Sequence, residues 1–87
     1  MKNNALHING CDNVVIATRD IAKNDLVVAG GKQLFYAAEA VGAGHKIALI
    51  EIDAGDHVIR YGEPIVKALE KIYPGQWIHT HNTRPIS

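Results

Sequence analysis

Apolar residues along this chain fall in short runs separated by glycine-rich turns. One phrase occurs four times: an aliphatic residue, two residues, a glycine or asparagine, two residues, and a second aliphatic residue. The four phrases span residues 21–27, 41–47, 52–58 and 72–78. Each predicts a tight turn in which glycine or asparagine adopts a positive φ, followed by a strand whose apolar residues enter a core. In the last phrase Pro74 precedes Gly75, which favours a type II turn.

The phrases belong to a larger repeat. When residues 17–47 are laid over residues 48–78 without a gap, nine of the 31 positions are identical, whereas about two identities are expected by chance. One short β-rich unit is therefore used twice. The copies differ most clearly where Ala48 and Ile50 of one copy correspond to His79 and His81 one period later. We look for function at this replacement of apolar residues by histidines.

Runs of β-branched and aromatic residues predict strands at 14–17, 26–28, 47–52, 57–61 and 77–81. Many short strands punctuated by glycine indicate a compact, mostly β fold.

Two stretches, 33–41 and 65–72, are rich in Ala, Leu, Lys and Glu, and we predict one or two short helical turns in each. Pro64 suits the first position of such a turn. Because the two stretches are equivalent in the repeat, we expect them to share a conformation.

Length and composition indicate one small domain over residues 1–87. Residues 1–11 and 83–87 lie outside the repeat, and we expect them to be flexible. The net charge of zero and the pI near 7 give no electrostatic footprint for nucleic acid or a membrane surface. The single cysteine, Cys11, fits a reducing cytoplasm, and no secretory or membrane-spanning segment is recognisable. So small a core would gain from docking onto a partner.

Three motifs occur in a specific order: GHKIAL at 44–49, VIRYGEPI at 58–65 and HTHN at 79–82. Together they resemble the SAF-type domain of the altronate/galactarate dehydratase (UxaA) family, over roughly residues 12–82. The resemblance implies a β-clip fold. It also implies either the N-terminal part of a long dehydratase or a separate small subunit beside a large catalytic subunit, and we expect the separate form.

The same resemblance implies a reaction. Members of the family remove water from sugar acids such as altronate and galactarate, giving 2-keto-3-deoxy acids, with a divalent metal that is iron in the best-known cases. We expect iron(II), held mainly by the large subunit. A related branch is sulfolactate sulfo-lyase, in which a small subunit assists C–S cleavage. Residues 28–41 match no family motif, which leaves the substrate branch open.

His79 and His81 are the candidate catalytic and metal-ligating residues. On a strand, residues two apart share a face, so the two imidazoles would converge on one metal ion or one anionic group. The alternative is that an exposed histidine pair merely closes the last strand. Two ligands do not complete a metal site, so others would come from His45 or from the large subunit.

Four further residues are candidates for substrate binding: His45, Lys46, Tyr61 and Asn82. Lys46 would act as a point charge for a carboxylate, or would be a solvated lysine. His45 has Gln76 as its repeat counterpart, so the alternative is an exposed turn exit in both copies. Asn82 would bind a substrate hydroxyl or close an Asx turn on its own backbone. Tyr61 has the alternative of a residue at the core edge with a wet hydroxyl.

Two classes of function remain open. In the first, the chain is a subunit of a sugar-acid hydro-lyase and is inactive without a large subunit. In the second, it is a non-catalytic module that binds the sugar acid or covers a site. In either case the isolated chain is a candidate for a homo-oligomer. Trp77 and Phe35 are interpreted as core or interface anchors.

Overall fold

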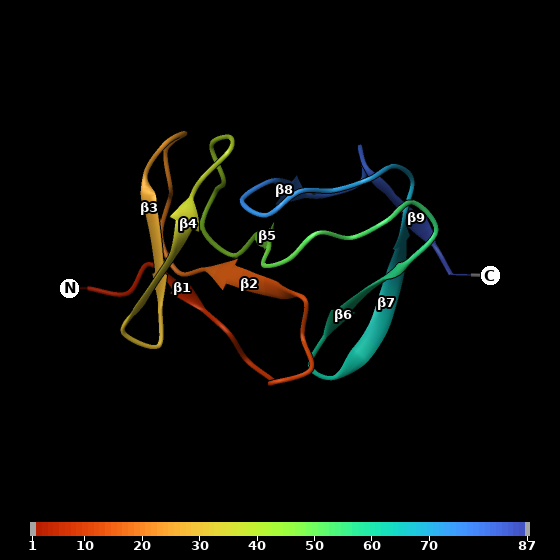
Figure 1. Ribbon diagram of the computed structural model, residues 1–87, viewed down its shortest axis with the longest axis horizontal. Helices are drawn as coiled ribbons and strands as arrows, with labels where there is room; N and C mark the ends of the chain where they lie inside the picture. The colour runs from red at the N-terminus through yellow and green to blue at the C-terminus, as the bar shows by residue number, and fades with distance from the viewer. Residues whose placement is uncertain (1, 87) are drawn as a thin grey trace.

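The computed structural model describes residues 2–86 as short strands joined by turns, without a helix in that range (Figure 1). The strands are β1 (Ala5–Leu6), β2 (Val14–Ala17), β3 (Leu26–Ala29), β4 (Lys32–Tyr36), β5 (Lys46–Ala48), β6 (His57–Arg60), β7 (Glu63–Ala68), β8 (Trp77–Ile78) and β9 (Thr83–Pro85). The prediction of a small, mostly β domain is confirmed. No helical segment of the described range could cross a membrane, since that range contains none.

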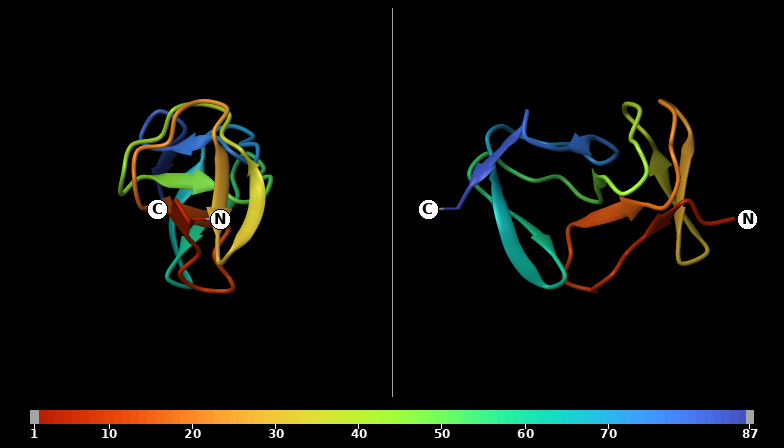
Figure 2. Two further views of the ribbon diagram at one scale, coloured as in Figure 1. Left: turned by 90° about the vertical axis from the view of Figure 1, so that its left-hand side faces the viewer. Right: turned by 180° about the vertical axis from the view of Figure 1, so that it is seen from behind.

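The strands form three antiparallel sheets. A central sheet has the order β1-β2-β5-β8, β3 pairs with β4 as a hairpin, and the third sheet has the order β6-β7-β9. The β3–β4 hairpin lies toward the N-terminal end and the β6–β7–β9 sheet toward the C-terminal end, with the central sheet between them (Figures 1 and 2). The molecule is elongated, with extents of 40 × 23 × 19 Å.

The four repeated phrases form the predicted turns. Their glycine-like residues all have positive φ: Asn24 (73°), Gly44 (84°), Gly55 (87°) and Gly75 (90°). In each turn the next residue donates its backbone N–H to the carbonyl three residues earlier, as Gln76 does to Tyr73 over 3.1 Å. This bond and the φ of Gly75 fit the type II turn expected at Pro74. The aliphatic residues that begin the phrases pair as isolated bridges, Ile21 with Val41 and Ile52 with Ile72.

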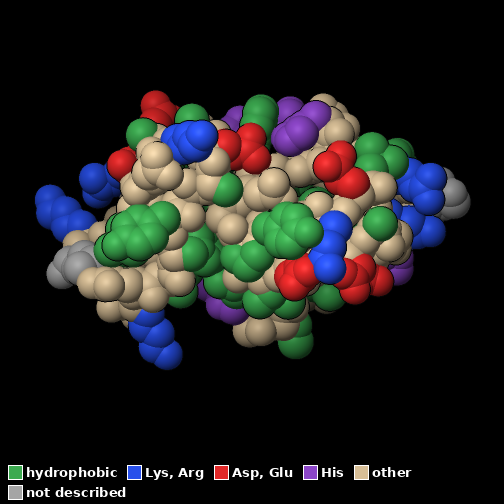
Figure 3. Space-filling model, turned by 45° about the horizontal axis from the view of Figure 1, so that its top comes forward, with side chains coloured by type: hydrophobic (Ala, Val, Ile, Leu, Met, Phe, Trp, Pro, Cys, Tyr) green, Lys and Arg blue, Asp and Glu red, His purple; other side chains and the backbone are tan. Residues whose placement is uncertain are grey.

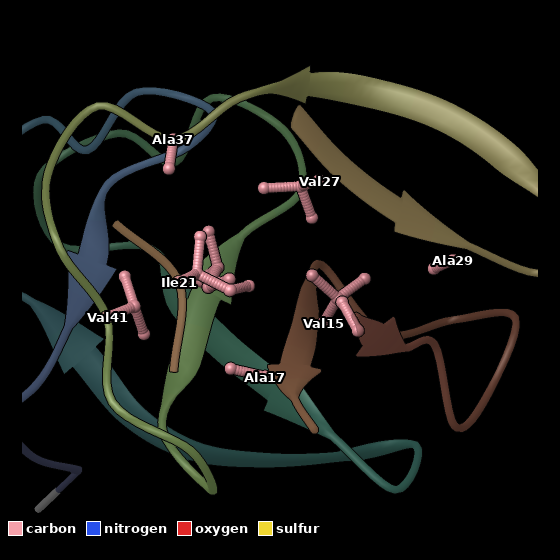
Figure 4. Close-up of a cluster of buried hydrophobic side chains, with 9 residues drawn as sticks. Val15, Ala17, Ile21, Val27, Ala29, Ala37 and Val41 are labelled. Carbon is pink, nitrogen blue, oxygen red and sulfur yellow. The ribbon is translucent and has the colours of Figure 1, made fainter. Parts of the chain in front are cut away.

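The repeat is also visible in space. Each copy contributes one hairpin, β3–β4 or β6–β7, and the register shifts by one residue at equivalent places, between Val27 and Val28 and between Val58 and Ile59. Each copy also supplies most of one hydrophobic core. Core 1 is drawn in Figure 4 and consists of Ala5, Val15, Ala17, Ile21, Val27, Ala29, Ala37, Val41 and Ile47. Core 2 consists of Val14, Ala48, Ile52, Val58, Ala68, Ile72 and Ile78.

The two cores are built from equivalent residues. Adding 31 to a core 1 position gives a core 2 position in six cases: Ala17/Ala48, Ile21/Ile52, Val27/Val58, Ala37/Ala68, Val41/Ile72 and Ile47/Ile78. The central strands supply both cores by alternation, since neighbouring residues of a strand face opposite ways. Ile47 of β5 lies in core 1 and the next residue, Ala48, lies in core 2.

The helical turns predicted at 33–41 and 65–72 are wrong. Both stretches begin as strands, in β4 and β7, and their backbone groups pair with β3 and β6. Helix propensity is a weak preference, and a stretch this short cannot nucleate a stable helix against such pairing. Pro64 lies opposite Ile59, next to the shift in register. There its missing N–H disturbs the ladder least. The expectation that the two stretches share a conformation is confirmed.

The terminal stretches expected to be flexible contain paired strands. β1 joins the central sheet through β2, and β9 pairs with β7. Asn4 adds side-chain bonds, accepting from the Val28 N–H over 2.8 Å and donating to the Leu26 carbonyl over 2.9 Å. Residues 1 and 87, which also belong to these stretches, lie outside the described residues.

Candidate functional site

The predicted strand over 77–81 ends at Ile78, so His79 and His81 lie in a turn and not on one face of a strand. The cause is Asn82, whose side-chain oxygen accepts the His79 N–H over 3.0 Å. A polar side chain that bonds nearby backbone groups in this way competes with the ladder of a sheet. The Asn82 amide nitrogen also donates to the Trp77 carbonyl over 2.8 Å.

Asn82 is 6% exposed. Its side chain therefore closes the turn, which is one of the two roles the sequence left open. A contact between Asn82 and substrate stays a prediction.

The turn nevertheless brings the predicted imidazoles together around one indole. The ring of Trp77 stacks on His79, with centroids 5.0 Å apart and an interplanar angle of 11°. His81 lies 5.1 Å from the same ring, tilted by 42°. His45 meets Trp77 edge-on at 5.5 Å and His79 edge-on at 5.2 Å. We call these four residues the imidazole cluster. Histidine side chains gather along the upper edge of the face shown in Figure 3.

Trp77 also determines which nitrogen of His45 carries the proton. The indole Nε1 donates a hydrogen bond to His45 Nδ1 over 3.2 Å. Because an indole N–H only donates, Nδ1 must accept, and the proton of the neutral ring lies on Nε2. In this state His45 offers an N–H donor at Nε2 and no free lone pair. It is therefore suited to bind an oxygen of a ligand and poorly suited to serve as a metal ligand.

The electrostatics of the cluster favour a neutral His79. Burial lowers the pKa of His79, and the positive charges of His45, Lys46 and His81 lower it further. The ring therefore keeps an unprotonated nitrogen to a more acidic pH than an ordinary histidine. A neutral imidazole can accept a proton or bind a metal.

Two of the predicted substrate-binding residues lie outside this cluster. Tyr61 is in the turn between β6 and β7, which lies on the opposite side of the molecule from β8 in Figures 1 and 2. Lys46 belongs to β5 and pairs with Ile78, so its half-buried side chain takes the face of the sheet opposite to Trp77, although its charge still acts on His79. Burial lowers the pKa of Lys46, and the charge of Arg60 adds to this effect.

Sequence reasoning missed three residues at or near these groups. Trp77 was interpreted as an anchor and not as the centre of the cluster. Glu39 accepts the Trp77 backbone N–H over 3.1 Å, and its identity with Glu70 in the repeat was a signal that could have drawn attention to it. Arg60 was overlooked although it replaces Ala29 in the repeat.

The cluster offers imidazoles that can donate, accept and exchange protons, but not a complete metal site. Within residues 2–86, no three His, Cys, Asp or Glu side chains are arranged so that they could hold a metal ion. Three protein ligands are the usual minimum for a catalytic metal. The chain alone therefore does not fit the iron expected from the resemblance, and further ligands would have to come from another polypeptide.

Comparison with known proteins gives the same family as the motifs. A family model described as the altronate/galactarate dehydratase SAF domain matches residues 3–85. The altronate dehydratases of Bacillus subtilis (strain 168) and Escherichia coli (strain K12) are 39% and 40% identical to this chain over 79 residues. These matches cover 91% of this chain but 16% of each relative, so the chain spans about a sixth of their length.

A shorter relative is also similar. The (2R)-sulfolactate sulfo-lyase subunit alpha of Paracoccus pantotrophus is 46% identical over 41 residues, which cover 47% of this chain and 61% of the relative. The family model, in contrast, covers nearly all of the described residues. The chain therefore belongs to the altronate/galactarate dehydratase SAF-domain family.

Proposed function

We propose that this chain is the small subunit of a metal-dependent sugar-acid dehydratase and works only together with a large catalytic chain. The reaction is loss of water from an aldonate or aldarate, giving a 2-keto-3-deoxy acid. The observation that carries the proposal is the imidazole cluster, in which three histidines surround Trp77 at positions that are partly apolar in the other copy of the repeat. The similarity to altronate dehydratases supports the class of reaction.

The residues of the cluster have distinct roles in this proposal. The reaction requires a base for the proton on the carbon next to the carboxylate and an acid for the departing hydroxyl group. His79, which favours the neutral state, accepts the carbon-bound proton. The exposed His81 donates a proton to the hydroxyl oxygen as the C–O bond breaks, so that water leaves. His45 donates its Nε2–H to a substrate oxygen.

A divalent metal, iron(II), would supply a Lewis acid that holds the substrate carboxylate. Because residues 2–86 do not complete a site for it, the metal is held mainly by the large chain. His79 and His81 are the candidates for ligands from this chain. For each of them, ligation and proton transfer are alternative roles.

A second candidate is the small subunit of a sulfolactate sulfo-lyase, favoured by the 46% identity to a subunit alpha of that enzyme. The two candidates differ in the bond that breaks, C–O or C–S, and in the product released, water or sulfite. A third candidate, a lid without chemistry, predicts that the histidines affect substrate affinity alone.

The test is to purify the chain together with a large dehydratase chain and to measure dehydration of altronate and galactarate with ferrous iron. We expect the double variant His79→Ala/His81→Ala to lower kcat by at least about 100-fold, the usual size of a lost acid or base. His57→Ala is the matched control, because His57 is an exposed histidine on β6 outside the cluster.

The outcomes separate the candidates. Full activity of the double variant contradicts a catalytic role. A raised KM with unchanged kcat favours the lid, because such a variant has lost binding that is equal in the ground state and the transition state. Sulfite release from (2R)-sulfolactate, without dehydration of either sugar acid, favours the sulfo-lyase.

A further inference from the structure

Two positively charged residues stand at positions whose counterparts 31 residues earlier belong to core 1. The 31-residue shift that relates the cores also relates β2 to β5, so that Val15 corresponds to Lys46 and Ala29 to Arg60. Val15 and Ala29 both belong to core 1, are labelled in Figure 4, and are at most 6% exposed. A shift of 31 residues thus exchanges two members of one apolar cluster for a lysine and an arginine.

The sheet register directs Lys46 toward core 2. Its partners on the neighbouring strands are Ile16 and Ile78, and residues directly opposite each other share a face. Ile78 belongs to core 2, and Ile16 packs against it. The Lys46 stem therefore lies on the core 2 side of the sheet, half-buried, and the charge of Arg60 is close enough to lower the pKa of the ammonium group.

Arg60 is half-buried, and one of its donors lacks a partner. Its Nε atom is buried and has no hydrogen-bond partner among the described residues. Within residues 2–86 the ion pairs formed are those of Lys71 with Glu51 and Asp53, and neither Arg60 nor Lys46 pairs with a carboxylate. Both side chains are half-buried, and holding two unpaired positive charges partly out of water is costly.

Tyr61, next to Arg60, is held in a strained backbone conformation. Its φ is 56°, and the equivalent residue of the first copy is Gly30, with a φ of 59°. A left-handed conformation is costly for a residue with a Cβ atom, whereas glycine adopts it freely. The Asp12 carboxylate fixes the turn by accepting the N–H groups of Tyr61 at 3.0 Å and Gly62 at 2.8 Å. The ring of Tyr61 then lies 5.2 Å from the Arg60 guanidinium carbon.

We propose that Lys46, Arg60 and Tyr61 form a binding site for a carboxylate. The guanidinium offers its N–H groups as a fork, the ammonium adds a point charge, and the tyrosine ring covers the arginine. The carboxylate comes either from a small organic acid or from an acidic side chain of another polypeptide. The site differs from the imidazole cluster in the face that it uses, because Lys46 pairs with Ile78, the residue next to Trp77, and the Lys46 and Trp77 side chains therefore take opposite faces of the sheet. The proposal holds whether or not the histidines catalyse dehydration.

The first experiment follows the Arg60 Nε–H signal of the ¹⁵N-labelled chain by NMR during titration with galactarate, a dicarboxylate. Galactitol, the neutral polyol with the same carbon skeleton, is the control ligand. We expect a saturable shift with galactarate and none with galactitol. Arg60→Gln and Lys46→Gln should each weaken binding about tenfold, as expected for loss of a charge-assisted bond. Arg84→Gln, which removes an exposed arginine on β9, should leave it unchanged.

A second variant separates loss of the site from loss of the fold. Lys46→Val with Arg60→Ala installs the residues found 31 positions earlier, Val15 and Ala29, and extends the apolar surface beside core 2. We expect this variant to melt at a higher temperature than the natural chain and to bind no galactarate. Functional sites commonly reduce stability in this way.

The second experiment identifies the source of the carboxylate. If galactarate gives no shift, the labelled chain is mixed with the large dehydratase chain. A shift of the Arg60 Nε–H signal, together with weaker association of Arg60→Gln, then assigns the carboxylate to a side chain of that partner. If the signal responds neither to galactarate nor to the large chain, the proposal is wrong, and the two side chains only extend their charged ends to water from the rim of core 2.

Discussion

Trp77 organises the imidazoles through two different properties of its ring. Its face stacks on His79, while its N–H fixes the tautomer of His45. The indole itself is half-buried and packs against core 1, so its position is determined by the fold and not by the histidines. One residue thus transmits the rigidity of a core to three side chains that otherwise lie on turns. Preorganisation of this kind is what acid–base groups require.

Replacement of Trp77 by phenylalanine tests the tautomer. In the natural chain we expect neutral His45 to carry its proton on Nε2, with Nδ1 accepting the indole bond. In Trp77→Phe the Nδ1 resonance should move to the position of an unbonded nitrogen, and the loss of one hydrogen bond should reduce the free energy of unfolding by about 0.5–1.5 kcal/mol. Long-range ¹H–¹⁵N NMR of the ring nitrogens identifies the His45 tautomer in the natural chain and in the variant, and His57 is the internal control. A natural chain whose His45 carries its proton on Nδ1 would contradict the hydrogen bond.

Gly75 and Gly44 are equivalent in the repeat but differ in their surroundings. A Cβ atom on Gly75 would lie 2.8 Å from the Tyr36 carbonyl oxygen and 3.2 Å from the Ala38 backbone nitrogen. A Cβ atom on Gly44 would meet nothing within 4 Å. Both residues have positive φ, so Gly44→Ala should cost about 1–2 kcal/mol of strain. Gly75→Ala should cost about 1–3 kcal/mol more, because backbone atoms have to move.

Urea unfolding of the two variants at one pH gives the comparison. The strain term is common to both, so their difference isolates the contact of Gly75 with the chain at Tyr36. Equal losses would mean that this segment moves freely away from β8.

At the scale of elements, local chemistry predicted the turns and the strands at 14–17, 26–28 and 57–61, but it failed for the stretches 33–41 and 65–72, which begin as strands. Asn24 and Gly75 sit in turns that require a positive φ, which a single residue can signal. The stretch at 65–72 depends instead on pairing with β6, and composition alone favoured a helical turn. The strand at 77–81 was ended by Asn82, a side-chain contact that no periodicity reports.

Part of the candidate site could be predicted from the sequence, and part of it could not. The histidines were visible because the repeat provided an apolar reference at Ala48 and Ile50. Their assembly around Trp77 was not predictable, since His45 and Trp77 are 32 residues apart and meet only through pairing of β5 with β8. The exchange of Ala29 for Arg60 was equally visible in the repeat. Its interpretation as part of a binding site depends on Lys46, and the face that Lys46 takes is known only from the sheet register.

The β6–β7 turn gives a pH-dependent prediction at this scale. Burial alone would raise the pKa of Asp12, but its bonds from the N–H groups of Gly62, Tyr61 and Asn9, together with the charge of His7, lower it overall. A carboxylate with a lowered pKa stabilises the fold above the unfolded-state pKa of about 3.9. That contribution is lost as the pH falls from about 5 through the lowered pKa.

Asp12→Asn should therefore unfold at a lower urea concentration than the natural chain at pH 7, and the difference should shrink as the pH falls below about 4. Urea midpoints at several pH values provide the measurement. Asp56→Asn is the control, because Asp56 is an exposed aspartate of another turn whose hydrogen bonds within the described residues are made by its backbone. A difference that is constant from pH 7 to pH 3 would show that the Asp12 charge does not hold the turn.

On the scale of the whole molecule, two small cores share one sheet. Neither core is large: core 1 has nine buried members and core 2 has seven. The strands β2 and β5 contribute residues to both, so a rupture of either core disturbs the sheet that supports the other. The imidazole cluster packs beside core 1, and the proposed carboxylate site lies at core 2. If the two cores unfold together, the imidazole cluster and the carboxylate site are therefore lost in the same unfolding transition.

Deletion of equivalent core residues tests this cooperation. Ile47 of core 1 and Ile78 of core 2 are both fully buried, at 0% exposure, on the paired strands β5 and β8. Truncation of a buried isoleucine to alanine costs about 2–5 kcal/mol, against a total of about 4–13 kcal/mol for a domain of this length. If the cores unfold together, Ile47→Ala and Ile78→Ala should each lower one common transition. Trp77 fluorescence reports on core 1, amide exchange in β6–β7 reports on core 2, and the two should give coincident midpoints. Separate midpoints in Ile78→Ala, with fluorescence unchanged while β6–β7 opens, would mean that each copy of the repeat is stable by itself and that the two sites can be lost independently.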